Sequence, residues 1–344
     1  PPPIPAPVRI HAMADGPACD EELFIRGSHE NTSGPVPRRF LEALDAMPVV
    51  SETSGRLELA NRVLADDNPF PARVMVNRVW QHLFGEGIVK SVDNFGVLGD
   101  EPTHPELLDR LADDFRNDGW SVKRLIRRIV LSRSYRMAST PHPETAAKLA
   151  ELDPSNRLLH AQHLKRLEGE ALRDAMLAVS GRLDRSLGGE PIPVRLTPFM
   201  QGRGRPSESG PLDGDGRRSL YIKVQRNFLT PMLTAFDFPI PATTVGRRNV
   251  SNVPAQALIL LNDPFVIDQA QVWAKRTLAV SRLSTADRTE CLYEAAYSRQ
   301  PTTEETNAAI AYLESHGDDW QTNETAWADL CHVLLNGKEF VFVR

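Results

Sequence analysis

The residues best suited to chemistry in this chain gather at 68–96, where amide, guanidinium, imidazole and indole side chains alternate with apolar ones around a Gly-x-Gly turn. Side chains four residues apart share a helix face, so Asn77 is expected beside Gln81 and Arg78 beside His82. An imidazole oriented by the carboxylate of Asp93 can act as a general base. The alternative is a buried polar network in which Arg78 pairs with Asp93 or another carboxylate and orders the Phe95-Gly96 loop. The candidates are Asn77, Arg78, Trp80, Gln81, His82, Asp93 and Asn94.

A second group of candidates is mainly basic and surrounds the segment FDFPIPATTVG at 236–246. Guanidinium groups form paired hydrogen bonds to carboxylate, sulfate and phosphate, so these arginines suit an anionic ligand. The alternative is a clamp between Arg247 or Arg248 and either Asp237 or Asp263, because so proline-rich a segment lacks regular backbone hydrogen bonds. Under that hypothesis, Arg247→Ala or Arg78→Ala lowers stability before any other property. The candidates are Arg217, Arg226, Asp237, Arg247, Arg248 and Asp263.

Motifs for nucleophilic or metal-dependent catalysis are absent from the sequence. It contains no G-x-S-x-G, no phosphate-binding loop and no H-E-x-x-H. Cys19, Cys291 and Cys331 form no C-x-x-C pair and no C-x-x-C-H haem motif, so the sequence predicts no metal and no cofactor in this chain. A disulfide between Cys291 and Cys331 is an alternative to the favoured free thiols. These observations leave open whether the chain is an enzyme.

The overall composition is typical of a folded protein of 344 residues, with 41% hydrophobic and 25% charged residues. The net charge of −5 argues against general nucleic-acid binding, which needs a basic face. No apolar run approaches the roughly 18 residues of a membrane span. The start PPPIPAPV predicts a proline-rich linker that continues an upstream domain.

Helical periodicity dominates from Arg56 onward, which predicts a mainly α-helical fold: a compact multi-helix domain over 56–344. Residues 1–55 are predicted to be an extended lead-in and the tail of an upstream domain, with short strands at 8–13 and 23–26. Gly and Pro at about 188–217 predict a mobile loop, and short strand elements are expected around 194–224. The predicted helices include 56–65, 72–84, 103–117, 122–130, 161–186, 264–280 and 324–335.

Several of these segments together resemble one family. They are IRGSHEN (25–31), VPRRFLEAL (36–44), NPFPARVMVNRVWQHLFGEGIVKSVDNFGVLGDEPTHPELLDRLA (68–112), EGEALRDAMLAVSGRLD (168–184), RRSLYIKVQRN (217–227), FDFPIPATTVGRRNVSNVPAQALILLNDPFV (236–266) and DLCHVLLNGKEFVFV (329–343). The chain resembles the C-terminal domain of unknown function of large exported proteins of Planctomycetes, which commonly carry a cytochrome-c-like module upstream.

This resemblance implies an exported protein, periplasmic or at the cell surface, with any haem on a missing upstream module, and it implies no known reaction. The leading hypothesis is a non-catalytic accessory domain. It would dock an upstream domain, another exported protein or an anionic polymer such as acidic polysaccharide. One alternative is an enzyme, a hydrolase or lyase, acting on acidic or sulfated polysaccharide. Another is a docking module of a cytochrome-c-type redox protein.

Overall fold

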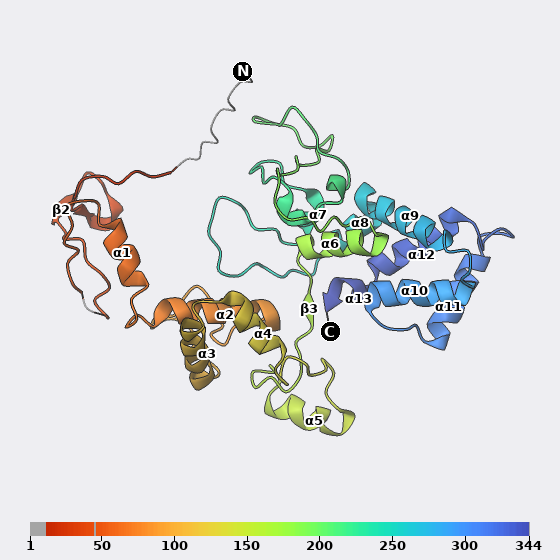
Figure 1. The fold of residues 1–344 in the computed structure, drawn as a ribbon, viewed down its shortest axis with the longest axis horizontal. Helices are drawn as coiled ribbons and strands as arrows, with labels where there is room; N and C mark the ends of the chain where they lie inside the picture. Colours follow the sequence, from red (N-terminus) through yellow and green to blue (C-terminus); the bar gives the residue numbers. More distant parts are fainter. Residues whose placement is uncertain (1–11, 45, 344) are drawn as a thin grey trace, which may run out of the picture. The chain divides into compact units, whose positions relative to one another are not determined.

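A computed structural model describes residues 12–44 and 46–343 and confirms the mainly α-helical fold (Figure 1). These residues form thirteen α-helices and two small two-stranded sheets. The chain divides into two compact units, which are described separately. Unit 1 comprises the described residues up to Leu83 together with Gly87–Lys90 and Glu101–Val130, and unit 2 comprises the rest. The boundary predicted at residue 55 stays a prediction.

Unit 1 combines a short hairpin with a group of helices. Strands β1 (Glu22–Phe24) and β2 (Thr32–Pro35) pair antiparallel, close to the strand predicted at 23–26, whereas most of the strand predicted at 8–13 falls outside the described residues. The helices are α1 (Arg56–Val63), α2 (Phe70–Phe84), α3 (Pro105–Asn117) and α4 (Val122–Val130).

The start of α3 differs from the sequence prediction. The spacing of Thr103 and Glu106 is typical of a capping box, but the N-cap residue is His104 and its side chain makes no capping bond. Instead, the Thr103 amide donates to the carbonyl of Ile88 at 2.9 Å. Thr103 therefore ties the Gly-x-Gly turn to the helix start, a tertiary contact that outcompetes the local cap.

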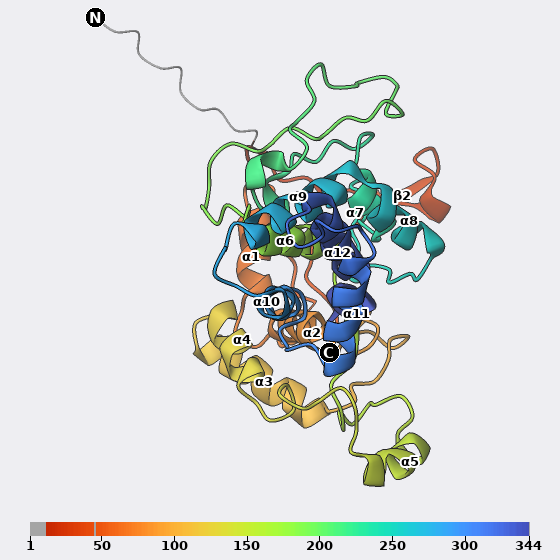
Figure 2. The ribbon, with the colours of Figure 1, turned by 90° about the vertical axis from the view of Figure 1, so that its right-hand side faces the viewer.

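Unit 2 is built around α9 (Pro264–Leu278) and α12 (Glu324–Asn336), which lie side by side in both ribbon views (Figures 1 and 2). Trp273 of α9 and Trp327 of α12 are fully buried between them and their neighbours. The remaining helices are α5 (Pro143–Leu152), α6 (Gly169–Ser180), α7 (Pro231–Ala235), α8 (Pro254–Asn262), α10 (Thr285–Tyr297), α11 (Thr303–Glu314) and α13 (Lys338–Val341).

The long helix predicted at 161–186 is wrong at both ends. Its first part is strand β3 (Lys165–Arg166), which pairs antiparallel with β4 (Phe342–Val343) near the end of the chain. Helix α6 begins only at Gly169 and ends at Gly181, whose φ of 82° is left-handed and favours glycine. A pairing partner nearly 180 residues away therefore decides the conformation of this segment.

Within the region around 194–224, where short strand elements were expected, residues 219–224 do not form a strand. Residues Ser219–Tyr221 form a 3-10 turn, and only a single parallel bridge joins Ile192 to Ile222. The buried guanidinium of Arg173 organises the irregular segment, donating to the carbonyls of Asp213 at 2.6 Å and Arg217 at 3.0 Å. One side chain from α6 thus supplies hydrogen bonds that a strand ladder would otherwise supply.

Two further predictions can be compared with the structure. All three cysteines are free thiols, and burial of Cys331 in the core raises the pKa of its thiol. Within the described part of the chain, no helix combines the length and apolar character required to cross a membrane.

Candidate functional site

Asn77 is fully buried and holds the turn that follows α2. Its side-chain amide donates to the Val89 carbonyl at 2.9 Å, and its carbonyl oxygen accepts from the Val89 amide at 2.8 Å. A Cβ on Gly87 would approach this amide to 2.8 Å, so glycine is required there. The side chain of Asn77 is therefore buried and bonded to backbone within unit 1, so it is not accessible to a ligand.

The other candidates on α2 do not form one accessible face. Trp80 is 7% exposed, so little of its ring is left for stacking on a ligand. Gln81 is half-buried, whereas Arg78 and His82 are exposed. Arg78 forms no ion pair with the described residues of its own unit. Asp93 belongs to unit 2, so the predicted pairing of Arg78 with Asp93 stays a prediction.

Asp93 and Asn94 lie in the loop at 91–100. The side chain of Asn94 accepts from the amide of Gly96 at 2.9 Å, a local turn contact. The carboxylate of Asp93 lies against the backbone of Gly246, where there is no room for a Cβ. This contact brings Asp93 to the proline-rich segment of the second group.

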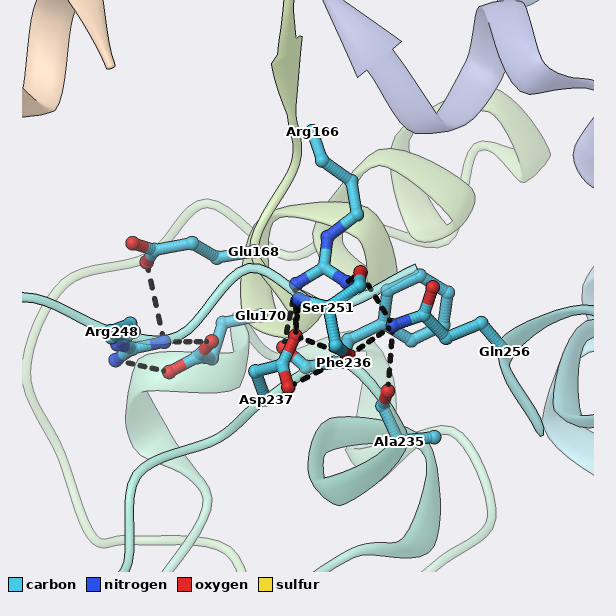
Figure 3. Close-up of polar contacts among 9 residues, drawn as sticks. All are labelled: Arg166, Glu168, Glu170, Ala235, Phe236, Asp237, Arg248, Ser251 and Gln256. Carbon is cyan, nitrogen blue, oxygen red and sulfur yellow. Dashed lines mark hydrogen bonds and ion pairs between the residues drawn. The ribbon is translucent and has the colours of Figure 1, made fainter. Parts of the chain in front are cut away.

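The proline-rich segment is held by a cluster around Arg166 and Asp237 (Figure 3). The Arg166 guanidinium donates to an Asp237 carboxylate oxygen at 2.7 Å and to the Ser251 carbonyl at 2.7 Å. Ser251 donates to the same carboxylate through its amide and its hydroxyl, each at 2.9 Å. Gln256 completes the cluster by donating to the carbonyls of Ala235 and Ser251. These residues form the polar cluster.

The polar cluster is mostly shielded from water. The side chain of Arg166 is 4% exposed and that of Asp237 is 18% exposed. Burial acts to raise the pKa of Asp237, but the hydrogen bonds from Ser251 and Arg166 outweigh it and lower the pKa below its ordinary value. A carboxyl group that stays ionised in this way is poorly suited to donate a proton as a general acid.

Arg248 is held by different partners from those predicted. It forms two hydrogen bonds with Glu170, at 2.7 and 2.9 Å, and a longer ion pair with Glu168 at 3.3 Å (Figure 3). The prediction that Arg247 or Arg248 pairs with Asp237 or Asp263 was therefore wrong in its partners. Asp263 caps α9 by accepting from the Phe265 amide at 2.9 Å, and burial raises its pKa.

The remaining arginine candidates divide into paired and exposed residues. Arg217 donates to the Gly188 carbonyl and stacks over the ring of Tyr221, with 4.2 Å between the guanidinium carbon and the ring centroid. Arg226 and Arg247 are exposed and have no ion pair in the described part of unit 2. The anion-binding candidates are thus reduced to these two.

A hollow of about 410 Å³ lies beside Arg248. It is a candidate for a catalytic site because several carboxylates line it. Three carboxylates line it, from Glu168, Glu170 and Asp174, together with Arg218. Each carboxylate is ion-paired: the two glutamates with Arg248, and Asp174 with Arg218 at 3.1 Å. The described residues also contain no group of three or more His, Cys, Asp or Glu side chains placed to hold a metal ion.

A larger groove, of about 670 Å³, opens beside α8 and is mainly apolar. Leu260, Phe236 and Val341 form its buried part. On the outer side of α8, Leu258 and Leu261 are 58% and 50% exposed. The sequence analysis identified none of these residues as candidates, because α8 (PAQALILLN) is apolar nearly all round and its periodicity does not separate a core face from an exposed one.

Sequence analysis also missed Arg166 and Arg173. Among the arginines in the described ion pairs, these two have the least exposed side chains. Each is 4% exposed. Arg166 stands in the short sequence HLKRLEG, where its spacing to other residues gives no indication of a partner. The partner, Asp237, is 71 residues away.

Together, the fold and these contacts define a mainly α-helical domain whose conspicuous polar side chains largely bind one another. A family model described as PSD1, protein of unknown function (DUF1553), matches residues 55–313, and the chain belongs to that family. This finding confirms the resemblance seen in the sequence. No curated protein and no solved structure was found to match the chain.

Proposed function

We propose that this chain is a non-catalytic interaction domain that docks a partner protein on the outer face of α8. The observation that carries the proposal is the exposure of Leu258 and Leu261. They lie three residues apart and therefore share a helix face, whereas only Gln256 and Leu260 of this helix are buried. Exposed apolar surface of this kind marks interaction sites.

The partner is expected to be an upstream domain of the same polypeptide or another exported protein, as the family resemblance implies. Its contact surface should be apolar, because α8 contains no charged residue from Pro254 to Asn262. Docking of an anionic polymer is less well supported, because Arg217, Arg218 and Arg248 are already engaged within the chain.

Site-specific photo-cross-linking in cells that produce the full-length protein tests this proposal. A p-benzoylphenylalanine placed at the position of Leu258 or Leu261 should cross-link to the same partner peptide, identified by mass spectrometry. The matched control position is Ala308, which is exposed on α11. A Leu258→Glu substitution should abolish cross-linking from position 261. Equal cross-linking from position 308, or none from α8, contradicts the proposal.

The rival proposal, an enzyme acting on acidic or sulfated polysaccharide, makes a different prediction. The chain would release reducing ends or unsaturated uronates from such polymers, and Asp237→Asn would abolish release without changing the thermal midpoint. We expect no release, and a lower midpoint in Asp237→Asn, because the carboxylate is bound to Arg166 and Ser251.

A redox docking role predicts a Soret band in the absorption spectrum of the full-length protein, arising from a haem on an upstream module. The same cross-linking experiment distinguishes this role, since the peptide captured from α8 would then come from a cytochrome-c-like domain.

A further inference from the structure

We infer that the groove beside α8 binds an extended peptide segment of the partner, with apolar side chains in the groove and a carboxylate at Lys338. This inference rests on the proposed function and specifies the chemistry of the docked segment. The described lining of the groove lies within unit 2 and comes from four places in the chain: Leu164 before β3, Phe236 just after α7, the segment from Asn252 to Leu260, and the segment from Asn336 to Phe342.

The apolar part of the groove suits side chains of a peptide. Its volume of about 670 Å³ lies within the roughly 300–1,000 Å³ typical of ligand sites. Phe236, Leu260 and Val341 are each at most 7% exposed and form an ordered floor. Leu164 and Val253 stand at its opening and are 59% and 42% exposed. An apolar side chain entering here would cover surface that is otherwise in water.

The described residues that line the groove carry only positive charge. Among the described residues that line it, Lys338 is the only charged one. Its side chain is exposed and forms no ion pair within the range of residues that the structure describes. An occupant with a carboxylate at this end is therefore complementary, and a cationic occupant is disfavoured.

The amide groups at the groove favour a peptide over a fatty acid. The side-chain nitrogens of Gln256 and Asn336 already donate within the chain, to Ala235 and His332. Asn252 is exposed and makes no side-chain hydrogen bond to any described residue. An asparagine amide can pair with both backbone groups of one residue, as Asn77 does with Val89. A peptide offers such backbone groups and a fatty acid does not.

The test begins with a random heptapeptide library displayed on phage and selected against the full chain. We expect the selected peptides to share one or two large apolar residues and an Asp, a Glu or a free carboxyl terminus. Dissociation constants for the synthetic consensus peptide are then measured by fluorescence anisotropy.

Three variants give the test its specificity. Lys338→Glu should weaken binding about tenfold, because an attractive charge becomes repulsive. Asn252→Ala should weaken it about fivefold through the lost amide pairing. The matched control Lys223→Glu, at an exposed lysine outside this groove, should change binding less than about twofold. A consensus peptide with Lys in place of its acid should bind Lys338→Glu more tightly than it binds the original chain.

Several results overturn the inference. They are selected peptides without an acid, equal weakening by Lys338→Glu and Lys223→Glu, or tighter Lys338-dependent binding of palmitate than of the consensus peptide. If cross-linking from Leu258 nevertheless succeeds, the docking proposal stands and only the peptide assignment fails. If cross-linking fails while the consensus peptide behaves as expected, the groove binds peptide but the outer face of α8 docks no partner.

Discussion

The polar cluster and the groove beside α8 are adjacent, but they differ in whether their side chains have partners within the chain. Gln256 and Phe236 belong to both: Gln256 donates into the cluster, the Phe236 ring packs under Arg166, and both side chains line the groove. In the cluster, each named polar side chain has a partner from the same chain. At the groove, Asn252 and Lys338 form no side-chain hydrogen bond or ion pair with the described residues, and part of the apolar surface is exposed. The difference shows that the polar side chains of the cluster bind one another within unit 2, whereas Leu258 and Leu261 on α8 stay exposed.

The largest expected effect concerns the polar cluster and its contribution to the free energy of unfolding. Arg166→Ala should lower the free energy of unfolding by about 3–5 kcal/mol, since it leaves the Asp237 carboxylate shielded and without its cation. Urea unfolding measures the change. Arg247→Ala is the control and should change stability by less than about 0.5 kcal/mol, because Arg247 is exposed. Equal losses in the two variants would break the comparison.

A second prediction compares two asparagines. Asn77→Ala should cost about 2–3 kcal/mol of unfolding free energy, because it leaves the buried amide and carbonyl of Val89 without partners. Asn252→Ala, at the groove, should leave stability within about 0.5 kcal/mol of the original while it weakens peptide binding. Thermal and urea unfolding measure the first effect. A destabilising Asn252→Ala would place that residue in the scaffold.

The ion pair between Arg248 and Glu170 should have a smaller effect. The Arg248 side chain is 29% exposed, so solvent screens the pair, and its two hydrogen bonds should contribute about 1 kcal/mol. A double-mutant cycle with Arg248→Ala and Glu170→Gln isolates this coupling. A coupling energy near zero would mean that Arg248 is available to a ligand after all.

The smallest expected effect is a pH dependence of the cluster. The folded-state pKa of Asp237 is lowered from 3.8, so its contribution to stability is present above that pH and is lost as the pH falls below it. Asp237→Asn removes the titrating group. The stability difference between the two proteins should therefore be larger at neutral pH than in acid. Urea unfolding across this range measures it, and a constant difference would exclude ionisation of Asp237 as the cause.

Local sequence signals predicted much of the helical framework correctly. Asp263 caps α9, and Thr302 with Glu305 forms the capping box of α11, as their spacing predicts. Helix α12 spans Glu324–Asn336, one residue beyond the predicted end. These elements depend on contacts within four residues, and such contacts are present in the sequence itself.

The candidate site was predictable only in part. The proline content of the segment at 236–246 led us to expect a clamp by Arg247 or Arg248, whereas the arginine bound to Asp237 is Arg166. Likewise, β3 pairs with β4 although the local pattern at 161–186 favours a helix. In both cases the observed conformation is stabilised by a partner that is distant in the sequence. Local residue preferences contain no information about such a partner.

The sequence alone determined the helical class, the ends of several helices and the family, because periodicity, caps and motif order are properties of neighbouring residues. Only the tertiary structure decided which arginine binds which carboxylate and which leucines stay uncovered. Ion pairing and burial depend on which distant segments meet in space. The spacing of residues along the chain does not show which segments those are.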